Sequence, residues 1–303
     1  MPAGEQESRL DRMLLRHLGL THRALLMRLI RKGNVRVNGK RCKANQRVQV
    51  GDEIFVPASL RPNQLEAQPE APVRSYTQAL AKVVVLFEDE HLLVVNKPAG
   101  MVVHGGSGHE MGLIEMLKVE RKIPELRLAH RLDRDTSGVL LLAKTLEALR
   151  PLTEDFRERD MDKTYIAWVS GHPEPSAARM TSHLSKGVSI AGERMVVHEE
   201  DGKLSVTDYQ VIQENHANDM PCALLALKPH SGRTHQLRVQ LQHEGHAILG
   251  DVKYAAREHL KQWKAAGGQG LMLHAWRLRL SHPITGQAMM FRAAMPARMR
   301  CWL

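Results

Sequence analysis

The segment from His130 to Gly138 reads HRLDRDTSG and combines carboxylates with arginines directly before an apolar run, residues 139–143. The apolar run predicts a buried strand. Asp133 is therefore expected on a turn beside arginines, at the entrance to a core. Because an ionised carboxylate near a core needs a defined partner, this placement favours a functional role for Asp133. A turn-forming or capping aspartate is the structural alternative.

HRLDxxTSG closely resembles the catalytic motif of the RluA-type pseudouridine synthases. Three later segments resemble further motifs of that family in the expected order: Lys163–Tyr165, Gly232–Arg238 and Gly245–Asp251. The resemblance implies an isomerase that breaks the bond between ribose C1′ and uracil N1, turns the base and rejoins it through C5. Such a reaction uses no redox cofactor, no metal and no ATP, so the resemblance implies that no cofactor is needed.

The resemblance gives the central role to Asp133, as a nucleophile at C1′ or as a base at the 2′ carbon, and the sequence leaves both open. Arg238 matches the family's arginine that pairs with the catalytic carboxylate and would orient it in a partly desolvated pocket. Tyr165 matches the tyrosine that packs against the target uracil, to which it offers a flat apolar face and a polar tip. Asp135 matches no catalytic position.

Two other arginines are expected to contact RNA. A uridine in folded RNA must leave its stack before this chemistry can happen, and Arg131 either fills the vacated space or supports Asp133. Arg233 is expected near the RNA backbone. Lys97 either contacts a phosphate or lies in a solvated turn.

Residues 9–57 have the pattern of a compact module. Apolar spacing predicts helices over 10–18 and 22–32, the second ended by Gly33. Asn38-Gly39 is the dipeptide favoured in a type I′ hairpin, and a small sheet is expected around it. The layout resembles the S4 RNA-binding module, which places four basic residues on or near an RNA-facing surface: Arg23, Arg28, Lys32 and Arg36. A solvated helix face without a ligand is the alternative.

A proline-containing linker, residues 58–80, is expected to be mobile and to precede a catalytic domain at 81–303. Helices are predicted over 112–122 and 146–160, the second kinked or restarted at Pro151. Strands are predicted over 83–87, 92–95, 139–143, 163–169, 206–211, 223–228 and 271–280. This mixture predicts an α+β fold with a largely antiparallel mixed sheet.

The charge distribution favours a nucleic-acid partner. The chain of 303 residues has a net charge of +10, and the first 60 residues contribute +7, from 12 Lys/Arg against 5 Asp/Glu. The three cysteines and 17 histidines form no CxxC, HExxH or paired Cys/His spacing, so no metal site is expected. A polar N-terminus and the lack of an apolar run of ~20 residues predict a cytoplasmic protein without a membrane span. A monomer is the default expectation.

Individual residues within the motifs indicate which RNA is the substrate. His130 differs from the glycine typical of the family's small-subunit branch, and the S4-like module argues against its shortest members. Residues 103–108 resemble the branch that acts on large-subunit RNA. The resemblance therefore implies uridines of 23S ribosomal RNA, free or in an assembling large subunit.

Two other functional classes remain open. A non-catalytic RNA-binding or ribosome-assembly protein would be expected to lack Asp133, Tyr165 or Arg238, and all three are present. A hydrolase would pair Asp133 with a second carboxylate, for which Asp251 is the candidate within a motif.

Overall fold

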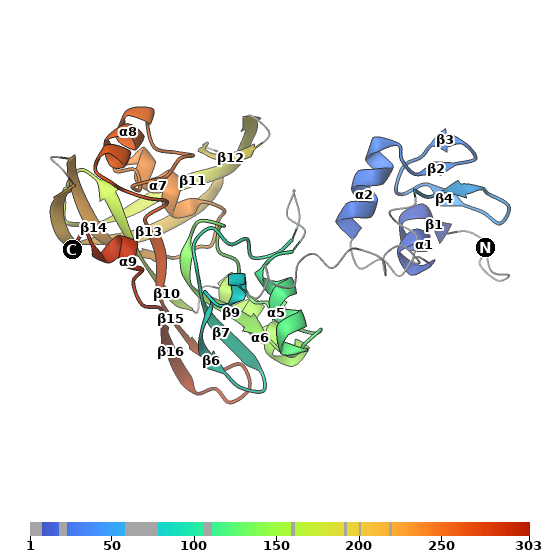
Figure 1. The fold of residues 1–303 in the computed structure, drawn as a ribbon, viewed down its shortest axis with the longest axis horizontal. Coiled ribbons are helices and arrows are strands. Elements are labelled where there is room, and N and C mark those ends of the chain that lie inside the picture. The colour runs from blue at the N-terminus through green and yellow to red at the C-terminus, as the bar shows by residue number, and fades with distance from the viewer. Residues whose placement is uncertain are drawn as a thin grey trace. The chain divides into compact units, whose positions relative to one another are not determined.

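The structure is a computed structural model that describes residues 8–17, 23–57, 78–105, 111–158, 161–190, 193–199, 201–217 and 220–303. The chain divides into two compact units, Met1–Tyr76 and Thr77–Leu303, drawn as ribbons in Figure 1. Most of the predicted linker, residues 58–77, lies outside the described residues. The two units are therefore described separately.

The described residues of the N-terminal unit form two helices and two small antiparallel sheets. The elements are β1 (Ser8–Arg9), α1 (Leu10–His17), α2 (Arg23–Lys32), β2 (Arg36–Val37), β3 (Lys40–Arg41), β4 (Arg47–Val48) and β5 (Ile54–Phe55). β1 pairs with β4, and β2 lies between β3 and β5. The helices and strands share one apolar core, which includes Leu10, Leu14, Leu26, Ile30, Val35 and Val48. The predicted pair of helices followed by a small sheet is confirmed.

Two turns of this unit depend on left-handed backbone. Asn38 and Gly39 have φ angles of 50° and 73°, as a type I′ turn requires, and they join β2 to β3 as the sequence predicts. Gly33 has a φ of 77° and ends α2. Local sequence therefore sets both boundaries.

The C-terminal unit is built on one 11-stranded sheet. Its strands are β6 (Val84–Glu88), β7 (Leu92–Lys97), β8 (Arg127–Leu128), β9 (Ser137–Ala143), β10 (Asp162–Ser170), β11 (Ala177–Ile190), β12 (Glu193–His198), β13 (Lys203–Ala217), β14 (Met220–Pro229), β15 (Leu273–Ser281) and β16 (Ala288–Arg292). Its helices are α5 (Leu113–Arg121), α6 (Leu146–Glu158), α7 (Gln236–His243), α8 (Arg257–Ala265) and α9 (Ala297–Arg300).

The strand order is β12-β11-β13-β14-β10-β15-β9-β7-β6, with β16 beside β15 and β8 beside β9. Every pairing in this sheet is antiparallel except that of β9 with β15, which covers two residue pairs. The predicted α+β fold with a largely antiparallel mixed sheet is confirmed. The parallel seam divides the sheet into two halves (Figure 1).

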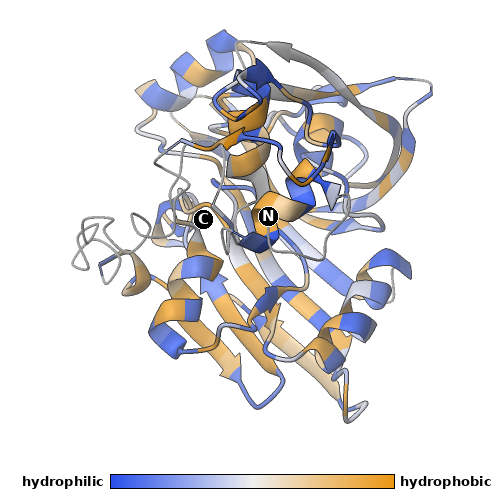
Figure 2. Ribbon diagram, turned by 90° about the vertical axis from the view of Figure 1, so that its right-hand side faces the viewer, coloured by the Kyte–Doolittle hydropathy of each residue, from blue (hydrophilic) through white to orange (hydrophobic). Residues whose placement is uncertain are grey.

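In the half containing β7 and β9, both faces of the sheet are buried. On one face, Leu117 of α5 packs with Leu93 and Leu140, and on the other, Leu152 of α6 packs with Leu141. Burial on both faces explains why β9 is an uninterrupted apolar run rather than an alternating one. Figure 2 shows hydrophobic residues concentrated along the central strands, whereas the helices carry hydrophilic stretches as well.

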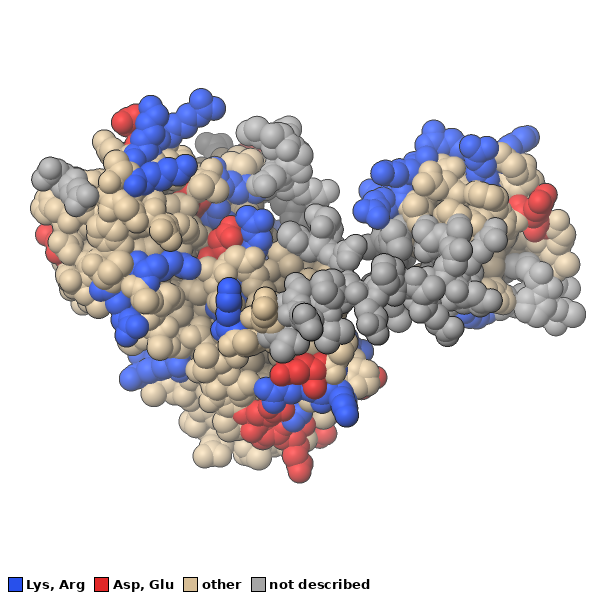
Figure 3. Space-filling view, in the orientation of Figure 1, with Lys and Arg blue, Asp and Glu red and all other residues tan. Residues whose placement is uncertain are grey.

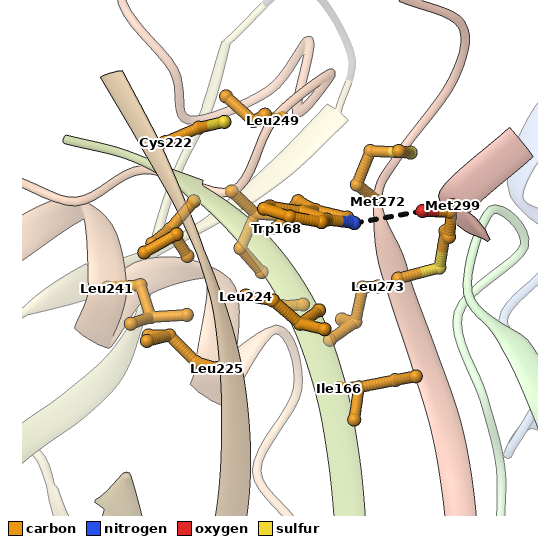
Figure 4. Packing of buried hydrophobic residues seen from close by; sticks show 14 of the residues in the cluster. Ile166, Trp168, Cys222, Leu224, Leu225, Leu241, Leu249, Met272, Leu273 and Met299 are labelled. Atoms are coloured by element: carbon orange, nitrogen blue, oxygen red, sulfur yellow. Dashed lines mark hydrogen bonds between the residues drawn. The ribbon is translucent and has the colours of Figure 1, made fainter. Parts of the chain in front are cut away.

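In the other half, the core surrounds Trp168 of β10, which is fully buried (Figure 4). Leu224 of β14 and Leu273 of β15 pack against it from the neighbouring strands. The indole Nε1 donates a hydrogen bond to the carbonyl oxygen of Met299 in α9 at 3.0 Å. Because a buried indole needs an acceptor, this bond also fixes the C-terminal helix against the sheet.

Two features differ from the sequence-based expectations. The hairpin of β11 and β12 was not predicted, because its sequence is polar and lacks a clear alternation. α6 continues through Pro151, so the predicted restart there is wrong, whereas the alternative of a kink at Pro151 stays a prediction. Its first turn is capped by the Thr145 hydroxyl, which accepts the Ala148 N–H at 3.2 Å, and the carbonyl that loses its donor to the proline belongs to Glu147, which is exposed.

The seam between β9 and β15 generates a stability prediction. Gly138 has a φ of 118°, and a Cβ there would lie 2.2 Å from the Ala275 carbonyl oxygen. Gly286 also has a positive φ, 71°, but no heavy atom within 4 Å of such a Cβ. We expect Gly138→Ala to lower the free energy of unfolding by at least about 3 kcal/mol and Gly286→Ala by about 1 kcal/mol.

Urea unfolding followed by tryptophan fluorescence measures this difference, because all four tryptophans lie in the C-terminal unit. Both variants place alanine at a positive φ, so the difference between them isolates the close approach of the two strands. Equal losses would contradict the idea that the seam requires a glycine.

Candidate active site

The loop that carries Asp133 precedes β9 and is fixed from below by Lys97. The Lys97 side chain is fully buried, and its Nζ donates hydrogen bonds to the carbonyl oxygens of Pro98, Met101 and Arg134 at 2.9–3.0 Å. Three acceptors match the three hydrogens of an ammonium group. Burial lowers the pKa of Lys97 to about 7, opposed by the nearby carboxylates of Asp135 and Asp133. Both sequence-based alternatives for Lys97, a phosphate contact and a solvated turn, are wrong.

A histidine supports each end of the same loop, the half-buried His130 at its start and the buried His274 at its end. At the start, His130 stacks on Phe156 with ring centroids 4.6 Å apart, and its Nε2 accepts the Leu141 N–H at 3.0 Å. At the end, Ser137 Oγ lies 2.9 Å from His274 Nδ1 across the seam between β9 and β15. Burial lowers the pKa of His130 to about 3 and that of His274 to about 4, so both rings are neutral supports.

Arg238 of α7 joins the Asp133 carboxylate to a second carboxylate beneath it. Its Nη1 donates to Asp133 Oδ2 at 3.2 Å, and its Nε and Nη2 donate to the two oxygens of Asp251 at 2.7 Å. Burial alone would lower the pKa of Arg238, but the hydrogen bonds and charges of Asp251 and Asp133 raise it. Arg238 therefore stays positively charged, and its guanidinium holds the Asp133 carboxylate in place.

Asp251 is a structural partner of Arg238 rather than a surface carboxylate. Its residue exposure is 1%, and its Oδ1 also accepts the backbone N–H groups of Lys253 and Tyr254 at 3.0 and 3.2 Å. The hydrolase alternative needs a second carboxylate that reaches the substrate, and a buried Asp251 does not provide one. Sequence reasoning named Asp251 as the candidate second carboxylate of a hydrolase and missed its pairing with Arg238.

Two residues to which sequence reasoning assigned no role complete this network: His235 lies beside Asp133, and Tyr254 lies beside His235. His235 Nε2 is 3.6 Å from Asp133 Oδ2, and His235 Nδ1 is 2.7 Å from the hydroxyl oxygen of Tyr254. His235 belongs to the Gly232–Arg238 motif, which was the available signal. Tyr254 lies three residues beyond Asp251 and had no such signal.

Tyr165 lies on β10, where the pairing with β15 changes register between Thr164 and Tyr165. Such irregularities re-aim side chains and are common beside active sites. Burial, together with the charge of Asp133, raises the pKa of Tyr165, so its hydroxyl stays protonated. Tyr165 therefore presents a neutral aromatic side chain beside the carboxylate.

One open pocket, with an empty volume of about 510 Å³, brings the predicted site residues of this unit together. Its lining includes Arg131, Asp133, Tyr165, Arg233 and Arg238. Arg131 and Arg233 are exposed, whereas Arg238 is buried. Asp135 is paired instead with the neighbouring Arg134 at 3.2 Å.

The other predicted RNA contacts belong to the N-terminal unit. Arg28 and Lys32 on α2 and Arg36 on β2 are exposed, and Arg23 begins α2 with its side chain outside the described residues. In Figure 3, the Lys and Arg side chains of this unit gather over α2 and β3. This unit therefore presents a basic surface of its own.

Within the described ranges, no three His, Cys, Asp or Glu residues come together as a group that could hold a metal ion. The helices in the part of the chain that the structure describes include none with the length and apolar character needed to cross a membrane.

Comparison with known proteins gives two family matches. A model described as RNA pseudouridylate synthase matches residues 91–243, and the S4 domain model matches residues 8–54. The chain is 42% identical to ribosomal large subunit pseudouridine synthase C of Salmonella typhimurium, over 99% of this chain and 93% of that protein. It is also 42% identical to the protein of that name from Escherichia coli K12, over 97% and 91%.

Solved structures give a similar result. Human RNA pseudouridylate synthase domain containing 1 matches with a TM-score of 0.62 and 27% identity, over 73% of this chain and 88% of that one. Human RNA pseudouridylate synthase domain containing 4 matches with a TM-score of 0.58 and 27% identity, over 75% and 96%.

The buried ion pair generates a second stability prediction. Asp251→Asn removes a charge but keeps the shape of the side chain, so it leaves the Arg238 cation with only the half-buried Asp133. We expect it to lower the free energy of unfolding by about 3–5 kcal/mol, because breaking a buried pair leaves a charge uncompensated. Tryptophan-monitored urea unfolding of the full chain measures the loss.

Asp162→Asn is the matched control. The Asp162 carboxylate faces Lys228, Arg277 and Arg279 at 3.7–3.9 Å but is 25% exposed. Its loss should cost less than about 1 kcal/mol. Equal free energies of unfolding for the two variants would contradict the prediction that the Arg238–Asp251 ion pair stabilises the fold more than the contacts of Asp162 do.

Proposed function

The chain belongs to the RNA pseudouridylate synthase family, in its RluA-type branch with an S4 domain, and on that premise we propose that Asp133 is its catalytic carboxylate and 23S ribosomal RNA its substrate. Membership makes it an isomerase that converts uridine in RNA to pseudouridine. The observation that carries the proposal for Asp133 is its carboxylate: 30% exposed in the pocket, with one oxygen held by the buried Arg238.

The reaction defines what the carboxylate must do. The C1′–N1 bond breaks, the uracil turns, and C5 bonds to C1′; C5 then loses a proton and N1 gains one, so that product and substrate are isomers. Asp133 acts at the ribose, either by attacking C1′ or by removing a proton from the 2′ carbon. Both roles require a carboxylate that is held in place before the substrate arrives, which Arg238 provides.

Tyr165 is proposed to hold the detached uracil, and Arg131 is proposed to fill the space that the flipped uridine leaves in the RNA. The protonated, partly buried ring of Tyr165 offers a flat surface against which the detached base can be held close to C1′. The side chain of Arg131 is exposed at the pocket and forms no hydrogen bond or ion pair with Asp133 or another residue in the described ranges. This favours the role of filling the space that the flipped uridine leaves over the role of supporting Asp133.

The choice of 23S RNA rests on the relatives, whose names refer to the large ribosomal subunit. Arg233 at the pocket and the exposed Arg28, Lys32 and Arg36 are proposed to contact phosphates. We propose the same for Arg23 from its place in the S4-like module. We expect the protein to act as a monomer and without bound metal, on free RNA or on an assembling subunit.

The chemical assignment is tested by tritium release from a 23S transcript labelled with [5-³H]uridine, because C5 loses its hydrogen in the reaction. We expect Asp133→Asn to lower the release rate by more than about 10³-fold. Asp135→Asn, the same change two residues away, should leave it within about twofold. Filter binding should show equal RNA affinity for both variants.

Each part of the proposal can fail separately. Normal release by Asp133→Asn would refute the catalytic assignment. Release by the wild type from transfer RNA but not from 23S RNA would refute the substrate. Binding without release from either RNA would favour the assembly-factor alternative.

The basic surface generates a prediction about salt. A triple variant with alanine at Arg28, Lys32 and Arg36 should lower the slope of log K against log salt concentration by about 2, since each contact to single-stranded RNA contributes ~0.7. A control with alanine at the exposed Arg157, Lys261 and Lys264 removes the same charge elsewhere. Equal slopes for the two variants would show that general charge, not this surface, drives binding.

A further inference from the structure

We infer that His235 is a second positioning residue for the Asp133 carboxylate, and that His235 and Arg238 together hold Oδ2 and leave Oδ1 as the oxygen that meets the ribose. The inference rests on the proposed function, in which Asp133 is the catalytic carboxylate. It adds a residue and assigns separate roles to the two oxygens.

His235 and Arg238 reach the same oxygen from the start of α7. Arg238 Nη1 lies 3.2 Å from Asp133 Oδ2, and His235 Nε2 lies 3.6 Å from it. His235 has a φ of 52° and a ψ of 19°, a left-handed conformation that few residues other than glycine adopt. This conformation places the imidazole beside the guanidinium, with 15% of the His235 side chain exposed.

Tyr254 determines which imidazole nitrogen carries the hydrogen. Its hydroxyl oxygen accepts the Val196 N–H at 3.1 Å and lies 2.7 Å from His235 Nδ1. Donation of the hydroxyl hydrogen to Nδ1 gives that hydrogen an acceptor and leaves the proton on Nε2. The opposite tautomer would set the Nε2 lone pair against Asp133 Oδ2 and would leave the hydroxyl hydrogen without an acceptor among the described residues.

The charges around the ring agree with this neutral tautomer. Burial lowers the pKa of His235, and the nearby Arg238 and Lys253 lower it further, whereas the carboxylates of Asp133 and Asp251 oppose the shift. The neutral ring then has a single N–H, which points at the carboxylate. His235 can therefore donate to Asp133 without adding a charge to the site.

The arrangement treats the two carboxylate oxygens differently. Oδ2 faces two donors, whereas no described residue donates a hydrogen bond to Oδ1. The separation of 3.6 Å is longer than a hydrogen bond, and such contacts commonly shorten when substrate closes the site. With Oδ2 held at two points, rotation about the bond to the carboxyl carbon is restricted, and Oδ1 is presented to the pocket.

Two substitutions at His235 separate positioning from folding. Glutamine can place an amide N–H close to the position of Nε2, whereas asparagine is too short to do so. Asparagine, however, accepts the left-handed backbone better than glutamine. A purely structural role therefore favours asparagine, and a positioning role favours glutamine.

The experiment measures single-turnover tritium release and, separately, RNA affinity for the full chain with the 23S transcript. We expect His235→Asn to slow release about 10- to 100-fold with affinity within about twofold, since hydrogen bonds to charged groups contribute this much. His235→Gln should stay within about threefold of the wild type. Tyr254→Phe, which removes only the hydroxyl that fixes the tautomer, should slow release about 3- to 10-fold. His216→Asn in β13 is the control and should have no effect.

Wild-type rates for both His235→Asn and Tyr254→Phe would overturn the inference, as would equal rates for His235→Asn and His235→Gln. Asp133→Asn is measured in parallel. An active Asp133→Asn variant overturns the proposed function, whereas an inactive one beside a fully active His235→Asn overturns only the inference. Tryptophan fluorescence confirms that each variant is folded, and Tyr254→Phe provides an independent test if either His235 variant is not.

Discussion

The geometry of the site depends on the buried ion pair between Arg238 and Asp251. An arginine that is only 8% exposed needs a fully engaged partner, and Asp251 supplies one with both oxygens at 2.7 Å. Two of the guanidinium nitrogens are then committed below the pocket floor, and the third is left to face Asp133. The position of Asp133 is thus set by a contact that never meets the substrate.

The loop that carries Asp133 is also fixed by side chains that contact its backbone and its two ends. Lys97 binds three carbonyl oxygens beneath the loop, and neutral histidines support its two ends. The seam where β9 and β15 run parallel begins directly after the loop. Rigid strands, not the loop itself, therefore determine where the carboxylate lies, which is the arrangement that precise chemistry requires.

Much of this could be predicted from the sequence, because local signals were strong. Asn38-Gly39 and Gly33 set the turns of the N-terminal unit, and the apolar run at 139–143 identified a strand that is buried on both faces. Asp133, Tyr165, Arg238, Arg131 and Arg233 do line one pocket.

What could not be predicted depends on contacts between distant segments. Asp251 was considered as the second carboxylate of a hydrolase, and its pairing with Arg238 becomes visible only when α7 and the following loop are folded. Lys97, which precedes a proline, was expected either to contact a phosphate or to lie in a solvated turn, yet tertiary packing buries it completely. The hairpin of β11 and β12 has no apolar alternation, so its sequence does not predict strands. Its strand structure depends on the pairing of β11 with β13.

The order in which the site residues occur along the chain has a consequence for biosynthesis. Asp133 and Arg238 are separated by 105 positions, and Asp251 and Tyr254 come later still, 13 and 16 positions beyond Arg238. A growing polypeptide that has emerged as far as β14 contains Asp133 and Tyr165 but neither Arg238 nor His235, which lie beside the Asp133 carboxylate. A chain that has been synthesised only as far as β14 therefore lacks the contacts that hold the Asp133 carboxylate in place, and these contacts form only after α7 and the loop to Tyr254 have followed.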